Sequence, residues 1–485
     1  MSQSVYRNIV RDIGVLGLSS ALVTASGIFL LPIITRNMGV ANYGLYVQFM
    51  VTVALVSTFA PLGLPYATVR FLAGHKDKKV IRDDVWSTMV LILIASLVFS
   101  AFFFLFADVI AKYLFDGHTF IVLVLAVILP VECMNVSMLN LFRVFQQNIR
   151  YAVVMLVKTY ADLAIIVFMI NNGYGIESIF VALLGLRLIL FALLAIYTVA
   201  MVGLSWPRFL RMREYFRFGV PNIPANIASW VSDVSDRYLI GIMLGTAFVG
   251  IYNPGYTLGQ IISIFMQPVD FVLVSAVSKY YNENRIDLVR NIFRFALKYY
   301  LLIAVPACCG ISLLSRQILL LITTPEIADQ GYLITPFVAF SMLLFGMGGV
   351  AFGKSLFLAN RNDINAAIWL LMAAVNLVLN LILIPTVGII GAAAATTIAY
   401  ALGFLISVHF AMKFFWFDID WPAIVRIVIA SIIMSAVVYF MSPSTLPDLI
   451  VTIVAGFVVY VVVVLLLGAV KRSEIDFFRS FSGTK

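Results

Sequence analysis

The chain has 485 residues, of which 63% are apolar and only 11% are charged. Soluble domains carry roughly 25% charged residues, so this composition excludes an ordinary water-soluble enzyme. The three cysteines lie in apolar segments and the three histidines are scattered, which excludes a disulfide scaffold and argues against a metal centre. We therefore interpret the chain as a polytopic membrane protein.

Long apolar windows divide the chain into membrane-spanning segments. A bilayer core needs about 20 apolar residues per helix, and this criterion predicts fourteen spans. They are 13–35, 44–64, 85–107, 119–142, 153–172, 176–203, 221–245, 252–278, 299–322, 332–358, 364–386, 388–412, 423–442 and 448–470. The loops between them are too short to form a separate domain, so we expect the function to lie within the membrane.

Lysine and arginine are distributed unevenly between the two sides of the predicted membrane. With the amino terminus in the cytoplasm, the cytoplasmic segments hold 24 of these residues, and the outer side holds only Arg36 and Lys112. Membrane proteins carry such an excess in their cytoplasmic loops. We expect a multi-pass protein of the cell membrane with both termini cytoplasmic. The net charge of +9 is then a topology signal and not a nucleic-acid patch.

The first half of the chain is echoed in the second. Two stretches that join spans on the outer side share four residue types at a constant offset of 206. The shared residues are Gly39, Ala41, Gly44 and Tyr46 in the first stretch and Gly245, Ala247, Gly250 and Tyr252 in the second. The predicted fold is an all-α polytopic membrane protein of about 14 transmembrane helices. Two six-helix halves are related by a pseudo-two-fold axis along the membrane normal, and two extra C-terminal helices follow.

This repeat predicts four segments. They are a first six-helix half at 1–204, a cytoplasmic amphipathic linker at 205–220, a second six-helix half at 221–412, and two additional transmembrane helices with a cytoplasmic tail at 413–485. Aromatic residues alternate with arginines in the linker, as is typical of a helix on anionic headgroups. We expect a passive anchor there, with mechanical coupling of the halves as the alternative.

Nine charged residues fall in the middle of predicted spans. Each costs roughly 2.5–3.5 kcal/mol on insertion scales, so such residues face a cavity or a partner. They are Glu132, Lys158, Asp162, Arg187, Asp233, Asp236, Arg237, Asp270 and Lys354.

The seventh predicted span carries a polar stripe. Its members follow one another at spacings of four, three, four and three, which is the helical period. They are Asn222, Asn226, Ser229, Asp233 and Asp236. Arg237 is expected to pair with Asp233, four residues earlier, which would leave Asp236 as a lone carboxylate. The stripe predicts a cavity lining, with a structural ion-pair triad as the alternative. The candidates for coupling to H⁺ or Na⁺ are Asp236, Asp233, Asp162 and Asp270.

The intramembrane cations are candidates for binding a phosphate. Lys158 and Asp162 lie four residues apart and are expected to neutralise each other, whereas Arg187 and Lys354 have no oppositely charged neighbour along the sequence. Arginine binds phosphate in bidentate fashion and lysine as a point charge. The candidates for substrate phosphate or sugar binding are Arg187, Lys354, Lys158, Arg237, Asn222 and Asn226. Pairing of the two cations with Glu132 or Asp270 across helices is equally compatible with the sequence.

Two features of the later spans concern helix geometry. Asn376 and Asn380 lie four residues apart, a spacing that favours hydrogen bonds to a neighbouring helix. Prolines cluster with the run Gly346-Met347-Gly348-Gly349, and such residues kink membrane helices.

One motif invites an enzymatic interpretation. Asp418-Ile419-Asp420 matches the DxD pattern by which glycosyltransferases hold a metal and a nucleotide sugar, but it falls in a short loop, so we expect a polar turn. The sequence has no Gly-Lys-Ser/Thr phosphate loop for ATP. We therefore expect no catalytic residues, no bound metal and no cofactor beyond a coupling ion, and we do not expect an enzyme.

Three segments resemble a known family. The run 376–393 is similar to the eleventh-to-twelfth span signature of prokaryotic polysaccharide flippases. Residues 35–39 with Tyr43-Gly44 resemble their first outer loop, and Phe218-Gly219-Val220-Pro221 resembles the entry to their seventh span. The chain thus resembles the polysaccharide branch of the multidrug/oligosaccharidyl-lipid/polysaccharide exporter superfamily.

The resemblance implies a function in surface polysaccharide or glycan assembly. A polyprenyl-(di)phosphate-linked oligosaccharide would move from the cytoplasmic to the outer leaflet by alternating access. A cationic cavity would take the sugar-phosphate head while the lipid tail stays in the bilayer. Membrane lipid and polysaccharide assembly proteins are the implied partners. Relatives that flip the peptidoglycan precursor carry arginines in the first span, whereas residues 13–34 have none, which makes that precursor a poor substrate candidate.

Two other functions compete with this interpretation. An ion-coupled multidrug or cation antiporter of the same superfamily is the nearest, but Arg187 and Lys354 argue against a cationic drug. A membrane sugar polymerase or ligase would need a large outer loop, and the longest predicted one, 108–118, is short.

Overall fold

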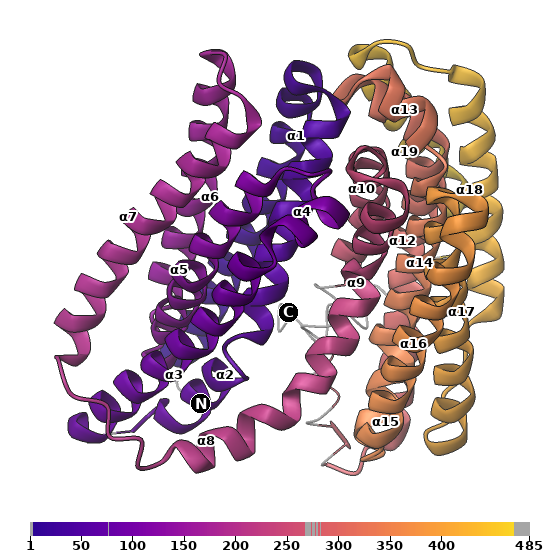
Figure 1. Ribbon diagram of the computed structural model, residues 1–485. Coiled ribbons are helices and arrows are strands. Elements are labelled where there is room, and N and C mark those ends of the chain that lie inside the picture. Colours follow the sequence, from indigo (N-terminus) through magenta and orange to yellow (C-terminus); the bar gives the residue numbers. More distant parts are fainter. Residues whose placement is uncertain are drawn as a thin grey trace. The chain divides into compact units, whose positions relative to one another are not determined.

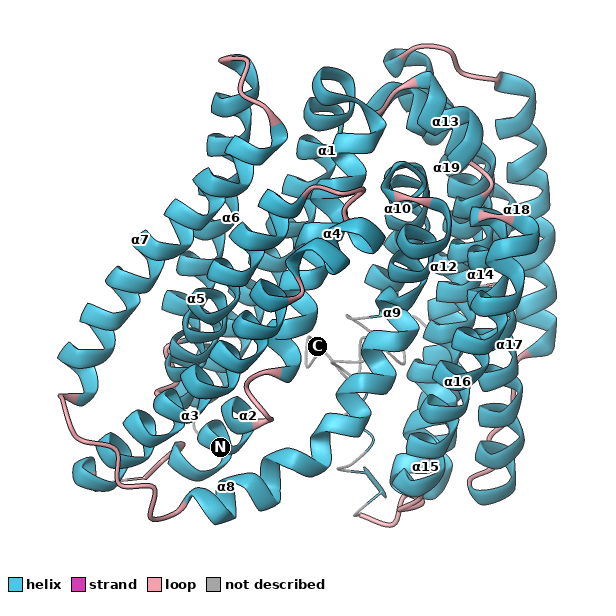
Figure 2. Cartoon of the chain, viewed as in Figure 1, coloured by secondary structure: helices cyan, strands magenta, loops and turns pink. Residues whose placement is uncertain are grey.

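The computed structural model describes residues 3–75, 77–266, 273, 277, 280–281 and 283–469, with the backbone alone for 3–14, 16, 222, 224–227, 229 and 233. Within these ranges the secondary structure is helical, without strands (Figure 2). The chain forms two compact units, Met1–Gly250 and Ile251–Lys485. The first unit includes the helix that we expected to open the second half. The segment boundaries at 204, 220 and 412 were derived from the sequence repeat, and they stay a prediction.

Eleven helices in the described ranges are long and apolar enough to cross a membrane. The first of them runs through the first two predicted spans, and it bends at Gly39, where φ is 80°. The predicted spans 221–245 and 252–278 are not among the eleven, and part of the second lies outside the described residues. The membrane character is confirmed, while the count of fourteen and the two-fold relation stay predictions.

The first unit is built around α5. Its elements, drawn in indigo to magenta in Figure 1, are α1 (Gln3–Phe59), α2 (Leu64–Leu72), α3 (Lys78–Leu105), α4 (Ala107–Leu114), α5 (Thr119–Val144), α6 (Asn148–Asn171), α7 (Ile176–Val202), α8 (Met212–Gly219), η1 (Val220–Asn222), α9 (Ile223–Leu244) and the start of α10 (Thr246–Gln260). Helix α5 packs against α1, α3 and α7. Most of its residues are apolar, and a helix that is apolar around most of its circumference has to be enclosed by others. Leu125 and Leu129 are accordingly fully buried.

In the second unit, the central long helices each pack against two others. Its elements after α10 are η2 (Ile261–Phe265), α12 (Ile286–Ile322), α13 (Pro325–Gly331), α14 (Ile334–Met347), η3 (Gly348–Phe352), α15 (Gly353–Leu358), α16 (Asn362–Val387), α17 (Ile389–Phe414), α18 (Trp421–Met441) and α19 (Leu446–Leu466). Helix α12 contacts α14 and α18, and α17 contacts α14 and α16. A Cβ on Gly391 would lie 2.3 Å from the carbonyl oxygen of Leu383. Small residues allow this close approach, as is common between membrane helices.

The linker after α7 is fastened to α3 by buried polar groups. Ser87 Oγ accepts hydrogen bonds from the backbone N–H groups of Arg208 and Phe209 at 3.0 and 3.1 Å. Asp84 accepts a hydrogen bond from the hydroxyl of Tyr215 in α8 at 2.8 Å. Burial raises the pKa of Tyr215, and its hydrogen bond to Asp84 raises that pKa further. The linker is therefore tethered to the first unit and is more than the lipid anchor that its composition predicts.

The DxD motif lies in the irregular loop before α18. Asp420 caps α18 by accepting a hydrogen bond from the backbone N–H of Ala423 at 3.3 Å, and it pairs with Arg294 of α12 at 3.1 Å. Burial raises the pKa of Asp420, but the bonds from Ala423 and Arg294 outweigh that effect and leave the pKa below its ordinary value. Asp418 is exposed. One carboxylate of the motif is thus occupied by structural contacts.

Candidate functional site

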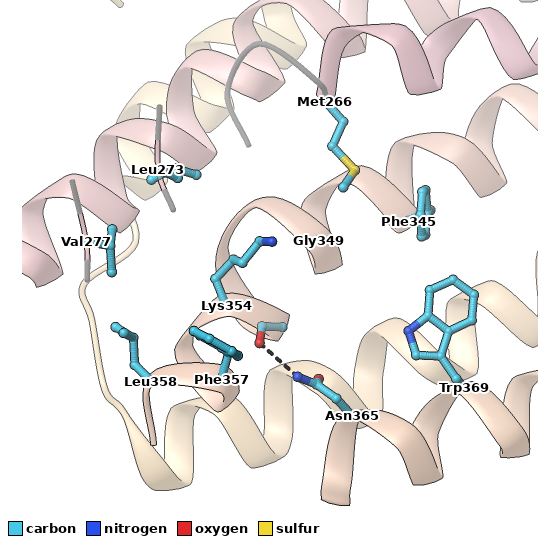
Figure 3. Close-up of a pocket in the computed structure, with 11 residues that line it drawn as sticks. Met266, Leu273, Val277, Phe345, Gly349, Lys354, Phe357, Leu358, Asn365 and Trp369 are labelled. Carbon is cyan, nitrogen blue, oxygen red and sulfur yellow. Dashed lines mark hydrogen bonds between the residues drawn. The ribbon is translucent and has the colours of Figure 1, made fainter. Parts of the chain in front are cut away.

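A cavity of about 420 Å³ in the second unit contains one of the predicted cations. Lys354 of α15 points into it, with the rings of Phe345 and Trp369 on one side (Figure 3). The two rings meet edge to face with their centroids 5.7 Å apart. The amide of Asn365 also lines the cavity.

The glycine run before α15 gives the cavity its shape. Residues Gly348–Phe352 form a π-helical turn between α14 and α15, and such turns occur frequently at functional sites. A Cβ on Gly349 would lie 2.6 Å from the Cε of Met266, so this glycine leaves room that a side chain would fill. Asn365 Nδ2 donates a hydrogen bond to the carbonyl of Gly353 at 3.0 Å, which fixes the start of α16 against α15 (Figure 3).

The arrangement suits a ligand with an anionic head and a polar body with apolar faces. An ammonium group is a strong donor to phosphate oxygens, and indole and phenyl rings offer flat apolar surfaces, with a polar N–H in the case of tryptophan. Lys354 is the cation that we predicted from its position mid-span. Asn365, Trp369 and Phe345 were not predicted. The sequence did contain a pattern that could have indicated two of them, because Asn365 and Trp369 lie four residues apart on one face of α16 and follow a glycine run.

A second group of charges is buried at the junction of α5, α6 and α7 in the first unit. Arg187 donates two hydrogen bonds of 2.7 Å to the carboxylate of Asp162, and its Nε lies 3.0 Å from Glu132. Lys158 pairs with the other oxygen of Glu132. Only 7% of the Arg187 side chain is exposed. Two cations thus neutralise two carboxylates in a low-dielectric environment, where an unpaired charge would be very costly.

Two expectations about this cluster need correction. The predicted pair of Lys158 with Asp162 is wrong, because Arg187 occupies both oxygens of Asp162 and Lys158 turns to Glu132. Arg187 is not an unpaired cation either. Its pairing with Glu132 across helices, one of the two possibilities that the sequence allowed, is confirmed. Three of its nitrogens already face carboxylates, which leaves it poorly placed to clamp a phosphate in this conformation.

Helix α9 holds a second ion pair. Arg237 donates to Asp236 both from its backbone N–H at 2.8 Å and from Nη1 at 3.0 Å, and both residues are buried. The expectation that Asp236 is a lone carboxylate is therefore wrong. The remaining members of the predicted stripe lie outside the residues whose side chains are described, as does Asp270. These members are Asn222, Asn226, Ser229 and Asp233.

The asparagine pair of α16 serves helix packing, as we predicted. Asn380 donates to the Asn376 side chain at 3.1 Å, and Asn376 donates to Thr396 of α17 at 3.2 Å. Among the residues in the described ranges, no cluster of histidine, cysteine and acidic side chains could hold a metal ion.

Comparison with known proteins gives a family match. A family described as polysaccharide biosynthesis protein matches residues 33–327. Over 275 residues the chain is 25% identical to the probable low-salt glycan biosynthesis flippase Agl15 of Haloferax volcanii, a match that covers 56% of this chain and 58% of that protein. The chain therefore spans little more than half the length of this curated relative.

Solved structures share the fold over most of the chain. A structure of the lipid II flippase MurJ in an inward closed conformation has a TM-score of 0.76 at 17% identity, covering 93% of this chain and 98% of that one. An inward-facing multidrug resistance transporter of the MATE family has a TM-score of 0.61 at 15% identity, covering 82% and 95%. At these identities the likeness concerns the fold alone.

Proposed function

Because the chain belongs to the polysaccharide biosynthesis protein family, we propose that it is a flippase for a polyprenyl-(di)phosphate-linked oligosaccharide. It moves this lipid from the cytoplasmic to the outer leaflet by alternating access, for surface polysaccharide or glycan assembly. The relative from Haloferax volcanii is itself described as a probable flippase. The protein lies in the cell membrane with both termini cytoplasmic, in line with the 24 basic residues on that side.

The cavity at Lys354 carries this proposal. It combines a cation with two aromatic rings and an amide within the second unit. A sugar phosphate needs these groups: a donor for the phosphate oxygens, flat surfaces for the sugar ring, and hydrogen-bonding partners for its hydroxyls. We assign the phosphate contact to Lys354, and Trp369 and Asn365 to the sugar.

The lipid tail has a separate place in the same unit. An apolar groove of about 630 Å³ runs along α12, α18 and α19, past Pro306, Gly310 and Gly456. Its size and lining suit several isoprenoid units and no charged group. We propose that the polyprenyl chain lies in this groove while the head occupies the cavity.

The other charges take different roles. We assign Arg187 and Lys158 to holding Glu132 and Asp162, so that the three helices move as one body. Binding of substrate by Arg237, Asn222 and Asn226 stays a proposal, as does coupling to H⁺ or Na⁺. The candidates for that coupling are still Asp236, Asp233, Asp162 and Asp270, of which Asp162 and Asp236 face a guanidinium group.

Reconstitution into liposomes tests the proposed function. A fluorescent lipid-diphosphate oligosaccharide and a neutral glycolipid with the same sugar are placed in the vesicles, and external quencher reports the head that reaches each leaflet. We expect protein-dependent movement of the diphosphate lipid and little of the neutral one. Efflux of small organic cations under an ion gradient, without movement of either lipid, would instead show the antiporter.

A further inference from the structure

The second part of α1 and the start of α10 touch through two glycines of the first unit. A Cβ on Gly44 would lie 1.8 Å from the carbonyl oxygen of Thr246, and a Cβ on Gly250 would lie 2.4 Å from the carbonyl oxygen of Val40. Real side chains never approach a backbone oxygen so closely, so only glycine permits this contact at either position. The two backbones are therefore in direct contact.

The contact is reciprocal in the numbering of the repeat. Gly250 follows Gly44 by 206 residues, and Thr246 follows Val40 by the same 206. Gly44 meets the carbonyl of Thr246, and its counterpart Gly250 meets the carbonyl of Val40, which is the counterpart of Thr246. Contacts of this kind arise at a two-fold axis, where the same surface faces itself. The position is the one where the sequence repeat is most evident.

Below the glycines the same seam buries an amide without partners. Gln48 lies one turn after Gly44 and is completely buried, yet neither its Nε2 nor its Oε1 has a hydrogen-bond partner within the described ranges. It faces Gly241 of α9, where a Cβ would lie 3.3 Å from Oε1. A buried amide that makes no hydrogen bonds raises the free energy of the state that buries it.

One side-chain hydrogen bond between described residues crosses this seam between α1 and α9. The hydroxyl of Tyr238 donates to Thr52 Oγ1 at 2.7 Å, one turn beyond Gln48. Contacts between glycine backbones are individually weak. The seam is closed by direct packing of backbones, and water entering it would solvate Gln48.

We propose that Gly44 and Gly250 form a latch that closes the outer end of the transport path, and that the unpartnered amide of Gln48 keeps the closed state easy to open. This inference rests on the proposed alternating access and on the predicted orientation.

Accessibility of a cysteine in the seam tests the latch. Cys133, Cys308 and Cys309 are replaced by alanine, and Thr52→Cys serves as reporter for a membrane-impermeant maleimide in right-side-out and inside-out vesicles. Gly44→Ala and Gly250→Ala are each added, with Gly27→Ala as the control, because a Cβ at Gly27 of α1 has no neighbour within 4 Å.

We expect either latch variant to increase labelling from the outside severalfold, and Gly27→Ala to leave it unchanged. Equal rates in the Gly44, Gly250 and Gly27 variants would overturn the latch, and so would an increase seen only in inside-out vesicles. Gln48→Leu removes the unpartnered amide at similar size and should lower labelling below that of the parent. The Gln48→Leu variant tests the proposal even if an alanine variant does not fold. Increased labelling of this variant would overturn the role of Gln48.

The labelling needs no substrate. If labelling changes as expected but the protein moves no lipid-linked oligosaccharide, the latch is supported and only the proposed function is rejected.

Discussion

Arg187 is the residue on which the charge cluster of the first unit depends. Its guanidinium group binds Asp162 through two hydrogen bonds and lies against Glu132, so its removal would leave two buried carboxylates with only Lys158. Breaking a buried pair in this way costs about 3–5 kcal/mol. We expect Arg187→Ala to lower the free energy of unfolding by that amount, measured by thermal and denaturant unfolding of the purified protein in detergent.

Arg316 provides the control for this prediction. It pairs with Asp329 at 2.6 Å, but about half of each side chain is exposed. Exposed pairs contribute roughly 0–1 kcal/mol, so Arg316→Ala should have little effect. If Arg187→Ala were as stable as Arg316→Ala and failed only in binding phosphate, Arg187 would belong to the substrate site after all.

At the residue scale, the sequence identified the charged residues but not their partners. Position in the middle of a span is enough to single out Arg187 or Lys354, because a charge there is costly unless it faces a cavity or a partner. Partner choice is different, since it depends on how α5, α6 and α7 turn toward one another. Spacing along one helix favours Lys158 with Asp162, but the bidentate fit of Arg187 to Asp162 across two helices is stronger than a single i,i+4 pair.

At the scale of elements, the attachment of the linker to α3 makes a prediction about proteolysis. Ser87 is buried and accepts hydrogen bonds from two linker N–H groups, so Ser87→Ala would leave both N–H groups without that acceptor. We expect trypsin to cleave at Arg208 or Arg211 severalfold faster in this variant, measured from the face that is predicted to be cytoplasmic.

Ser96 is the matched residue on the same helix. It is buried too, but its hydroxyl donates to the carbonyl of Leu93 within α3. Ser96→Ala should leave cleavage at the wild-type rate. Equal cleavage of the two variants would mean that lipid, and not α3, holds the linker in place.

The contact of Asp420 with Arg294 predicts a pH dependence. The pKa of Asp420 is lowered in the folded protein, so its contribution to stability is present above the ordinary value of 3.8 and is lost as the pH falls through the lowered pKa. We expect Asp420→Asn to destabilise the protein at pH 7 and to differ progressively less from wild type below about pH 4.

Asp418→Asn is the control, because that carboxylate is exposed. Thermal unfolding between pH 3 and pH 8 measures the effect. A difference between wild type and Asp420→Asn that grew as the pH fell would contradict the assigned pairing.

Most elements could be predicted from hydropathy alone, since the bounds of α5, α7, α16 and α17 differ from the expected spans by at most two residues. Apolar length sets these bounds directly. The π-helical turn at Gly348–Phe352 could not be placed, because a glycine run indicates a break but not its geometry. The tether of the linker was also missed, since it depends on contacts between residues more than 100 positions apart.

For the whole molecule, the family resemblance drawn from three short motifs is confirmed by the match over residues 33–327. The orientation is a further prediction at this scale. In a variant without native cysteines, Asn172→Cys should react with an impermeant maleimide from outside, and Asn360→Cys only from inside. Both positions are exposed in loops between spans. The reverse pattern would contradict the positive-inside assignment.

The measurement that tests the central claim most directly is translocation by variants of Lys354 in proteoliposomes. A charge-assisted hydrogen bond contributes about 1.5–3 kcal/mol, so Lys354→Ala should slow movement of the lipid-diphosphate oligosaccharide about tenfold or more. Lys413→Ala, at an exposed position in α17, should retain the wild-type rate. Wild-type translocation in a correctly folded Lys354→Ala protein would show that the phosphate head does not pass through this cavity.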